Sequence, residues 1–254
     1  MNRKRSIILE RREKLMDLIV QAKNNHLNVE YAAEKLGISP VTLRRDLCLL
    51  EEEGLIRRAY GKVTLMAWNK GTENLMPDAG TEKIAKAAAE SVNARDVIFI
   101  NAGRIGLQML RLIAVPNVTV ITNHVLAVNT PHRSDMTLIL TGGEIHLPEQ
   151  ALVGDVAQRS IQTVHAEKAF LCCSGVSAER GITTAYYAEA AINSLMLSCC
   201  SGQSYLLVPH DRLEKSDHFC CGELRQIHEL ITDRKADPTA LKSLQETGLQ
   251  IRLA

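Results

Sequence analysis

Apolar residues near the start of the chain recur at helical spacing. A stripe through Ile8, Leu15, Leu18, Ile19 and Ala22 predicts a first helix, which ends near residues 24–26. Residues 29–36 predict a shorter second helix that packs through its alanines and a leucine. A third apolar stripe at residues 43, 47 and 50 predicts another helix with one buried face.

Local signals mark where the third helix begins and ends. Gly37 supplies a turn after the second helix, and Ser39 is suited to cap the free N–H groups of the next one. Pro40 suits the first helical position because its missing N–H has no partner there. Gly54 is the favoured type of residue just past a helix end. A helix, a short helix, a glycine turn and a capped helix make the helix-turn-helix order.

The segment after this helix predicts a β-hairpin. Residues 55–65 indicate two short strands around a turn near Gly61. Arg57, Arg58 and Lys62 would lie on this hairpin, where basic side chains can contact phosphates beside a DNA groove. We therefore interpret the hairpin as the wing of a winged helix-turn-helix.

The third helix carries the residues expected to read DNA. Its leucines face the core, so Thr42, Arg44 and Arg45 point elsewhere, and a short helix of this kind fits a major groove. A basic pair on a helix is usually only a solvated face. The cap at Ser39, the glycine turn and the basic hairpin together favour DNA contact instead. The predicted DNA-binding residues are Ser39, Thr42, Arg44, Arg45, Arg57, Arg58 and Lys62.

Beyond residue 81 the pattern changes to short apolar runs that alternate with helical segments. Strands are predicted at residues 97–100, 118–121, 137–140, 169–173, 205–208, 230–231 and 249–253, and helices at 82–91 and 107–113. This alternation is typical of a mainly parallel sheet covered on both faces. The predicted fold is an α/β main domain with a small N-terminal winged helix-turn-helix domain. The predicted boundaries are 1–65 for the DNA-binding domain, 66–81 for a linker and 82–254 for the effector-sensing and oligomerisation domain.

Charge separates the two parts. The net charge is +1, but residues 1–70 hold 14 Lys and Arg against 9 Asp and Glu, whereas the remainder holds 16 against 20. A basic head on an acidic body indicates that polyanion binding is confined to the head. No apolar run approaches the roughly 20 residues that cross a bilayer, and the N-terminus lacks a signal-peptide core, so we expect a cytoplasmic protein without membrane contact.

The seven cysteines do not suggest a metal site. Three adjacent pairs, at 172–173, 199–200 and 220–221, accompany Cys48, and none has C-x-x-C spacing or a matching histidine pattern. Most lie in apolar contexts, where Cys behaves as a small hydrophobe. We predict reduced structural thiols, with a redox or metal role left as the alternative. No metal and no cofactor is expected.

Small and hydroxyl residues follow several predicted strands. In a parallel sheet, ligands bind beyond the carboxyl ends of the strands, where backbone N–H groups can approach a phosphate closely. None of these loops fits a dinucleotide-binding or P-loop pattern. One such loop would be an ordinary turn, but four in succession predict a site for a phosphorylated ligand. Its predicted residues are Asn101, Gly103, Arg104, Thr122, Asn123, Gly142, Gly143, Ser174, Gly175, Thr183, Thr184 and Arg212.

The head motif resembles that of a known family. Val41-Thr42-Leu43-Arg44-Arg45-Asp46-Leu47, Leu50-Glu51 and residues 54–61 are similar to the recognition helix and wing of DeoR-family bacterial transcriptional regulators. One departure is Lys62, which stands where the family usually has a second glycine in the wing turn. A lysine there would add a phosphate contact, at a cost if the turn needs a positive φ.

The body resembles the sensor domain of the same family from about residue 82 to residue 233. The matching segments are Thr122-Asn123, Gly142-Gly143, Gly154, Lys168 to Gly175 and Gly181 to Thr184. The resemblance implies a fold similar to ribose-5-phosphate isomerase and a sugar-phosphate effector. Three departures from the family pattern concern that effector. Residues Asn101 to Ile105 stand where the family usually has Asp-Ser-Gly-Thr-Thr, and Pro209 to Arg212 stand where it usually has Asp-Ser-Ser-Lys. Glu167 stands where it usually has Asp.

The family resemblance implies that the chain is a sequence-specific repressor of a carbohydrate-catabolism operon. Its partners would be a double-stranded DNA operator, a phosphorylated sugar or related metabolite as effector, and further copies of itself, at least as a dimer. One alternative is a DNA-binding regulator whose α/β body only oligomerises. The other is an enzyme similar to sugar-phosphate isomerases, for which Glu144, Asp155, Cys173 and Glu189 are candidate bases, although none lies in a defensible motif. We expect no enzymatic activity.

Overall fold

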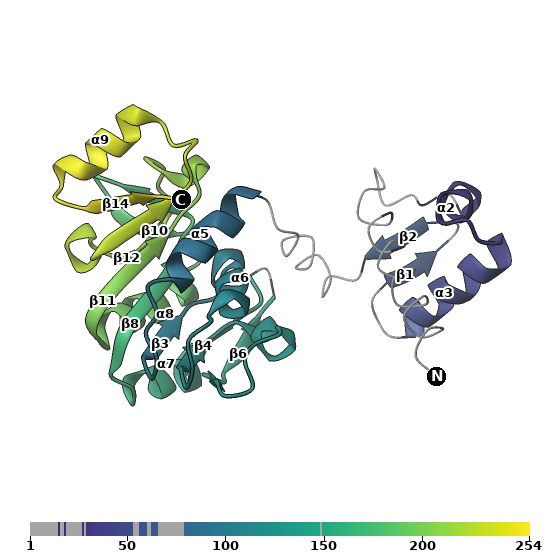
Figure 1. Cartoon of the computed structure of the whole chain (residues 1–254), viewed down its shortest axis with the longest axis horizontal. Helices are drawn as coiled ribbons and strands as arrows, with labels where there is room; N and C mark the ends of the chain where they lie inside the picture. The colour runs from purple at the N-terminus through teal and green to yellow at the C-terminus, as the bar shows by residue number, and fades with distance from the viewer. Residues whose placement is uncertain are drawn as a thin grey trace. The chain divides into compact units, whose positions relative to one another are not determined.

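A computed structural model of the chain describes Leu15, Leu18, Leu27 and residues 29–52, 56–59, 62–65, 79–147 and 149–254. Contacts divide the chain into two units, Met1–Met76 and Pro77–Ala254 (Figure 1). We call them the head and the body. Within the described residues, no helix combines the length and apolar character needed to cross a membrane.

Among the described residues, the head shows helices α2 and α3 and a hairpin. Helix α2 (Val29–Leu36) and helix α3 (Pro40–Glu52) are joined by a turn in which Gly37 has a φ of 63°, a left-handed conformation that glycine adopts freely. Strands β1 (Ile56–Ala59) and β2 (Lys62–Leu65) pair antiparallel. A core of leucine, alanine and valine holds these elements together, formed by Leu15, Leu27, Ala32, Ala33, Leu43, Leu47, Leu50 and Val63.

The body is built on a seven-stranded parallel sheet. In spatial order the strands are β14 (Gln250–Leu253), β13 (Glu229–Thr232), β11 (Cys200–Leu207), β8 (Ala166–Cys172), β3 (Val97–Ile100), β4 (Thr119–Thr122) and β5 (Thr137–Leu140). The interior strands carry near-continuous apolar runs because both of their faces are covered. Buried aromatic residues lie at the middle of the sheet, where the ring of Phe170 stacks on that of Tyr205 at 4.8 Å. The α/β prediction is confirmed.

Helices cover the sheet on both faces. From β3 the chain runs outward through β4 to β5, and after β8 it runs in the opposite direction to β14. Because such crossovers are right-handed, the two halves place their helices on opposite faces. Helix α5 (Ala79–Ala89) contacts α6 (Arg104–Leu112), and α7 (Gly154–Gln162) contacts α8 (Tyr187–Ser198), while α9 (Pro238–Glu246) lies beside β14 (Figure 1). The strand order therefore reverses between β3 and β8.

Small antiparallel elements lie beside the main sheet. Strand β6 (Glu144–His146) pairs with β7 (Ala151–Val153), and β10 (Gly181–Thr184) lies between β9 (Gly175–Ser177) and β12 (Phe219–Gly222). Short 3-10 helices are η2 (Val125–Asn129), η3 (His210–Arg212) and η4 (Leu224–Gln226). These strands of three or four residues were not predicted.

Several elements of the body begin earlier in the chain than predicted. Helix α5 begins at Ala79, so residues 79–81 are helical where a linker was predicted, and Thr81 is buried. Residues 66–78 lie outside the described part of the chain, as does most of the predicted first helix. Helix α6 begins three residues before its predicted start, and β11 begins five residues before its own.

Candidate functional site

Helix α3 presents Arg44 and Arg45 away from the head core, whereas its Asp46 is buried. The Ser39 hydroxyl accepts a hydrogen bond from the Thr42 N–H at 3.1 Å, which is the predicted cap, and it lies 2.9 Å from the Thr42 hydroxyl. Leu43 and Leu47 are buried, whereas Arg44 and Arg45 are exposed on the outer surface. The helix thus separates a packing face from a face that carries two guanidinium groups.

The hairpin has its turn near Gly61, as predicted. Ile56 lies opposite Leu65 and Ala59 opposite Lys62, which leaves residues 60 and 61 between the strands. The backbones of Arg57, Arg58 and Lys62 lie on β1 and β2, and their side chains fall outside the described part of the structure. The head therefore has helix, turn, helix and hairpin in the winged helix-turn-helix order.

The reversal point of the body's sheet is closed by side chains of the protein itself. Asn101 follows β3 and is 2% exposed. Its Nδ2 donates to the Cys172 carbonyl at 2.9 Å and to Asn193 Oδ1 at 2.8 Å, and its Oδ1 accepts from the Cys172 N–H at 2.7 Å. Asn101 therefore fastens β3 to the end of β8 and to α8. A crevice at such a reversal point is where α/β sheets usually bind ligands.

The Cys172 side chain occupies the space at the start of helix α6. Gly103 precedes the helix, and a Cβ at this position would lie 2.6 Å from the Cys172 Cβ, so only glycine fits. Backbone N–H groups of Ile105 and Gly106 face the Cys172 thiol, which uses the donors that a phosphate would otherwise need. Arg104 is the first helical residue, and its charge also acts on that thiol.

The loops after β4 and β5 serve mainly to hold the backbone together. Asn123 is buried; its Oδ1 accepts from the Ala102 N–H at 2.7 Å, and its Nδ2 donates to the Leu152 carbonyl at 3.1 Å. The Thr122 hydroxyl accepts from the His124 N–H at 3.1 Å. Gly143 has a φ of 112°, and a Cβ there would lie 2.3 Å from the Val153 carbonyl oxygen. Gly142 lies beside it, also with a positive φ.

A second group of predicted residues gathers around β10 and the end of β8. The Thr183 hydroxyl donates to the Gly175 carbonyl at 3.1 Å and accepts from the Asp217 N–H. Ser174 accepts a hydrogen bond from the Ala185 N–H, and its carbonyl accepts from the exposed Arg212 guanidinium at 3.4 Å. Arg212 lies on η3, so this group also contains a cation.

Asp233 holds the segment that carries Arg212. Its Oδ2 accepts hydrogen bonds at 2.9 Å from the backbone N–H of His210, and it lies 2.9 Å from the His210 ring nitrogen. Burial opposes ionisation of Asp233, but the hydrogen bonds from His210 and Lys235 prevail and lower its pKa below the usual range. The η3 turn is therefore anchored to the end of β13.

Two carboxyl groups with raised pKa values lie in the same region. Glu189, in the first turn of α8, accepts a hydrogen bond from the Thr184 hydroxyl at 2.9 Å. Its other oxygen is buried with no hydrogen-bond partner among the described residues. Burial and the nearby Glu149 raise the pKa of Glu189 to about 7, despite the Thr184 hydrogen bond. Burial also raises the pKa of Glu149, and this is partly offset by His146 and Arg212.

We call Glu149, Glu189, His146, Thr184 and Arg212 the carboxyl cluster. The ring of His146 meets that of Tyr186 edge-on at 4.6 Å, beside α8. Sequence reasoning named Glu189 only as a candidate base, and it missed His146 and Glu149. No motif surrounds these two residues, which reach the cluster through the unpredicted β6–β7 hairpin and its turn.

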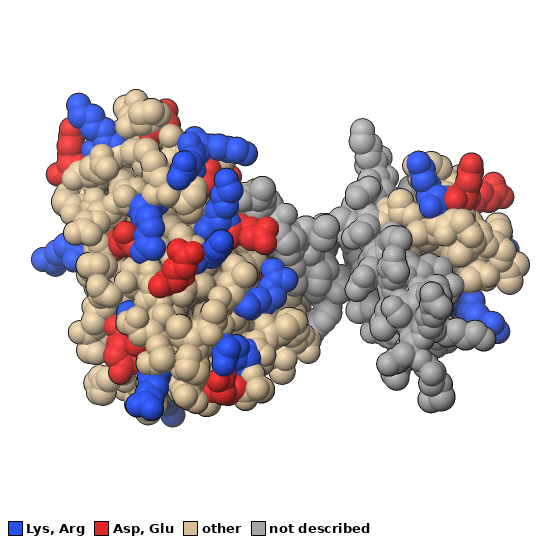
Figure 2. Space-filling view, viewed as in Figure 1, with Lys and Arg blue, Asp and Glu red and all other residues tan. Residues whose placement is uncertain are grey.

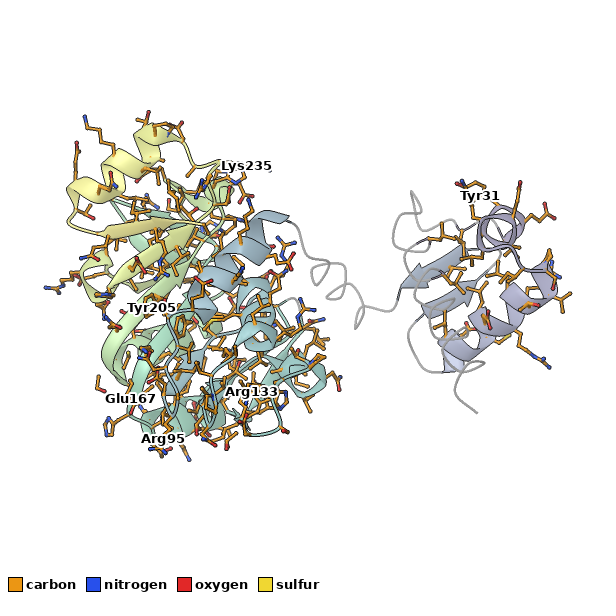
Figure 3. The ribbon with its side chains drawn as sticks, viewed as in Figure 1. Tyr31, Arg95, Arg133, Glu167, Tyr205 and Lys235 are labelled. Carbon is orange, nitrogen blue, oxygen red and sulfur yellow. The ribbon has the colours of Figure 1, made fainter. Side chains whose placement is uncertain are left out.

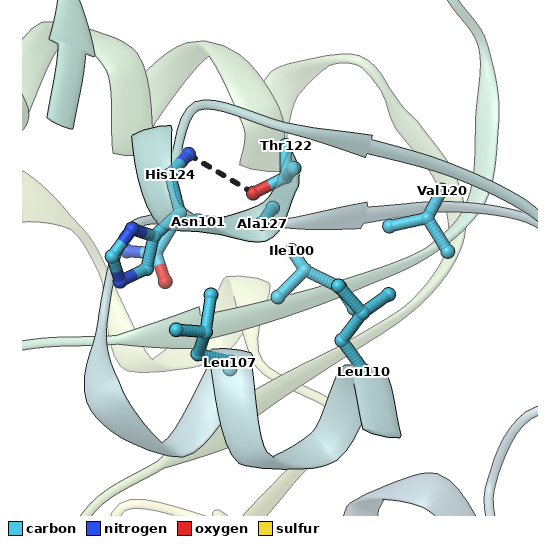
Figure 4. A pocket seen from close by; sticks show the side chains of 9 residues that line it. Ile100, Asn101, Leu107, Leu110, Val120, Thr122, His124 and Ala127 are labelled. Carbon is cyan, nitrogen blue, oxygen red and sulfur yellow. Dashed lines mark hydrogen bonds between the residues drawn. The ribbon is translucent and has the colours of Figure 1, made fainter. Parts of the chain in front are cut away.

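Figure 4 shows a narrow crevice between β3, α6 and β4. It contains about 180 Å³ of space between atoms, is lined mainly by aliphatic side chains, and is too narrow to admit a water molecule. His124 lies at its end, where burial lowers the pKa of the imidazole to about 4. Its Nδ1 accepts from the Leu126 N–H at 3.3 Å, which indicates a neutral packing residue.

The opposite end of the sheet is held by ion pairs. The Lys168 ammonium lies 2.5 Å from Asp96, and a Glu167 oxygen accepts from the Val97 N–H at 2.7 Å. In Figure 3, Glu167 lies near Arg95 at one end of the body, away from Lys235, which follows β13. Glu167 therefore has a structural role at the amino ends of the strands, and its departure from the family pattern does not alter the carboxyl cluster.

The thiols are free, and their pKa values are raised where a shift is resolved. Burial raises the pKa of Cys172 to about 11 and that of Cys221 to about 12, and it raises that of Cys173 well above the usual range. Protonated thiols are poor nucleophiles and poor metal ligands. No group of three or more His, Cys, Asp or Glu suited to a metal occurs among the described residues.

Sequence comparison identifies both units. Residues 11–67 match the model of the DeoR-like helix-turn-helix domain, and residues 79–234 match that of the DeoR C terminal sensor domain. The chain belongs to the DeoR family. It is thus a DNA-binding transcriptional regulator, and the family resemblance noted above is confirmed.

Curated relatives extend over nearly the whole chain. The chain is 26% identical to a putative aga operon transcriptional repressor of Escherichia coli O157:H7, with 96% of this chain and 93% of the relative covered. It is 30% identical to the lactose phosphotransferase system repressor of Lactococcus lactis subsp. lactis, with 97% of each covered. Among solved structures, ribose 5-phosphate isomerase A of Methanocaldococcus jannaschii matches with a TM-score of 0.38 and 13% identity over 53% of this chain and 54% of that one.

Charge on the DeoR sensor domain is mixed. On the face seen in Figure 2, basic and acidic side chains of the body are interspersed. A mixed surface gives no extended positive field to attract a polyanion. DNA contact is assigned to the head because residues 11–67 match the DeoR-like helix-turn-helix domain.

Proposed function

We propose that this DeoR-family regulator represses a carbohydrate operon and that a phosphorylated sugar or a related anionic metabolite controls its binding to DNA. Two observations support repression of sugar genes. The aga and lactose repressors are relatives over nearly the full length, and the chain matches both the sensor domain and the helix-turn-helix domain of the family. The α3 face with Thr42, Arg44 and Arg45 reads the operator, and Arg57, Arg58 and Lys62 on the hairpin contact phosphates.

The effector site lies at the carboxyl cluster. The observation that carries this assignment is the buried Glu189 oxygen without a partner, because a buried polar group normally finds one and a bound ligand can supply it. Arg212, held through η3 and Ser174, supplies the cation for the anionic group. The hydroxyl groups of a sugar suit Glu189 and Glu149, which accept hydrogen bonds when ionised and also donate them when protonated.

The remaining predicted effector residues have a supporting part in this proposal. Asn101, Gly103, Thr122 and Asn123 hold the strand-end loops in place, since their polar groups are bonded within the protein. Thr183 and Gly175 position Ser174, and Gly142 and Gly143 set the path of the chain after β5. Arg104 begins the helix that follows β3, and Arg212 bonds to the Ser174 carbonyl beyond the end of β8.

The protein acts as an oligomer, at least a dimer, on paired half-sites. One small helix-turn-helix rarely binds tightly alone, and the symmetry of an operator matches that of a dimer. The effector changes DNA affinity only by the difference in its own affinity for two states of the protein.

A mobility-shift assay tests the function directly. The full-length protein is mixed with the DNA upstream of its own gene, at fixed salt, with and without a panel of pentose and hexose phosphates. We expect a specific shift that at least one sugar phosphate weakens. A folded protein that gives no specific shift would overturn the function, and a specific shift that no phosphate or other anion alters would favour a body that only oligomerises.

A pair of arginine variants tests the effector site. Arg212→Ala should abolish the response to the active sugar phosphate and leave DNA binding intact. Arg225→Ala is the matched control because Arg225 is exposed and paired with Glu223 on a neighbouring 3-10 helix. Gly143→Ala is unsuitable for this purpose, because the Cβ would displace the backbone at Val153.

A further inference from the structure

Strand β5 is an unprotected edge of the main sheet. Its four residues, Thr-Leu-Ile-Leu, include no charged side chain, and Ile139 and Leu140 are 42% and 38% exposed. Long-lived monomers usually protect such an edge with charge, proline or a bulge, since exposed apolar edges pair with other strands. The opposite edge, β14, carries Arg252 and Gln250. The two edges therefore differ in how they are protected.

Apolar side chains continue outward from β5. Helix η2 and hairpin β6–β7 flank the strand; η2 contacts β5, and α7 contacts β6. A Cβ on Gly142, directly after β5 and its flanking Thr141, would touch Val156 of α7 at 3.5 Å. Six of the large exposed hydrophobic residues of the described chain lie on these segments. We call them the β5 patch: Val128, Ile139, Leu140, Ile145, Leu147 and Val156.

The size of the patch indicates a protein partner. From the exposed fractions, the six side chains present roughly 500 Å² of apolar surface, more than half of the about 800 Å² that each partner contributes to a standard interface. The largest apolar patch on a soluble monomer is typically about 300–600 Å² and is often functional. Because the six side chains carry no charge, the patch complements another copy of itself.

The free edge also has a defined hydrogen-bonding pattern. The N–H groups of Thr137 and Thr141 bond to β4, at the carbonyls of Val118 and Thr122. Since N–H and C=O groups alternate in direction along a strand, those of Leu138 and Leu140 point to the open side. A second β5 strand running antiparallel can accept and donate all four bonds when Leu138 faces Leu140 of the other copy.

We propose that two copies of this protein dimerise by antiparallel pairing of their β5 strands, with a two-fold axis at Ile139 and the β5 patch as the apolar core. The occupant is a second copy because the axis satisfies the free backbone groups of both edges at once, as an isologous contact requires. This interface rests on the self-association in the proposed function. It specifies which surface associates, and in what register.

Cross-linking tests the register. On the axis, the two Ile139 side chains form a pair without hydrogen bonds, whose Cβ atoms are about 4.5–5.5 Å apart. Under mild oxidation, full-length Ile139→Cys should form a disulfide-linked dimer several-fold faster than the wild type with its native cysteines. Leu140→Cys is the matched control: it lies on the same strand with similar exposure, but it faces Leu138 of the other copy. Equal rates for the two variants would overturn the pairing.

Sedimentation velocity tests the surface. Ile139→Lys should raise the dimer dissociation constant by at least about 100-fold, while Leu253→Lys on β14, 45% exposed, should not change it. Circular dichroism checks that both variants are folded. A wild-type monomer at micromolar concentration would overturn both the self-association and this interface. A dimer that survives Ile139→Lys, or that Leu253→Lys disrupts, would overturn the interface alone.

Discussion

At the scale of single residues, Glu189 has the most informative chemistry in the body. A carboxyl with a pKa of about 7 changes its charge within the physiological range, and the cause is burial together with the neighbouring Glu149. The Thr184 hydroxyl satisfies one oxygen, and the other remains unsatisfied in the described structure. An effector that donates a hydrogen bond to this oxygen would favour the ionised form, so ligand binding should release a proton near neutral pH.

The raised pKa predicts how Glu189 affects stability. In the folded protein, Glu189 keeps its proton up to about pH 7, whereas in the unfolded chain it loses the proton at about pH 4.5. The stabilisation that neutral Glu189 gives to the folded state is therefore complete below pH 4.5 and is lost as the pH rises to 7. The free energy of unfolding of Glu189→Gln, measured by urea denaturation, should therefore equal that of the wild type near pH 4.5. At pH 8 it should be higher than that of the wild type by about 1–2 kcal/mol. Glu246→Gln on α9 is the exposed control. If the free energies of unfolding of the wild type and Glu189→Gln changed with pH in the same way, the raised pKa would be contradicted.

The arginines of the head should differ in how they affect DNA binding. Arg44→Ala or Arg45→Ala should weaken the free energy of binding to the operator by about 1–3 kcal/mol wherever the guanidinium contacts a base. Binding to random DNA should change little. Arg57→Ala on β1 should weaken binding to all sequences alike and flatten the salt dependence. Titrations on operator and random duplexes at several salt concentrations measure both effects, with Lys242→Ala on α9 as control. Identical behaviour of the two classes would refute the division into reading helix and positioning wing.

At the scale of elements, the sequence predicts what depends on local patterning. Helix α2 has its predicted bounds, and β3 and β5 lie where their apolar runs lie, because buried parallel strands need continuous hydrophobic sequence. The short strands β6, β7, β9, β10 and β12 have only three or four residues each, too few for an apolar run to mark them, and their pairing depends on tertiary contacts. The contact of the Cys172 thiol with the start of α6 could not be predicted from local sequence either, because Cys172 lies on β8, far from α6 along the chain.

Asn101 joins three elements, and it stands where the family usually has Asp. An aspartate of the same shape would lose both donors of Nδ2 and direct an oxygen at two acceptors, the Cys172 carbonyl and Asn193 Oδ1. Asn101→Asp should therefore cost about 2–4 kcal/mol at pH 8, since it leaves buried polar groups unsatisfied and buries a charge.

Chemical denaturation measures this cost, and Asn129→Asp on η2 is an exposed control of the same chemistry. Asn101→Asp should regain part of its stability at pH 5, where the carboxyl is more often protonated. Equal stability of the two variants at pH 8 would show that the hydrogen bonds of Asn101 do not hold β3 to β8 and α8.

At the scale of the whole molecule, the β6–β7 hairpin connects two surfaces. Ile145 and Leu147 belong to the β5 patch, and His146 between them belongs to the carboxyl cluster and meets the ring of Tyr186. Glu149, in the turn of the same hairpin, lies near Glu189 and Arg212. Adjacent residues of one hairpin therefore face the proposed effector and the proposed second copy. A shift of the hairpin when the effector binds would alter both surfaces, and with them the spacing of two heads on an operator.

This arrangement predicts thermodynamic coupling between the effector and the dimer. If the active sugar phosphate changes the dimer dissociation constant by some factor, dimerisation must change the affinity for that sugar phosphate reciprocally. We expect coupling of about 5- to 150-fold, measured by sedimentation at several ligand concentrations and by calorimetry on the wild type and on the monomeric Ile139→Lys variant. His146→Ala should reduce the factor without changing dimerisation in the absence of ligand. Equal ligand affinity in monomer and dimer would mean that the signal reaches the heads by a route other than the hairpin.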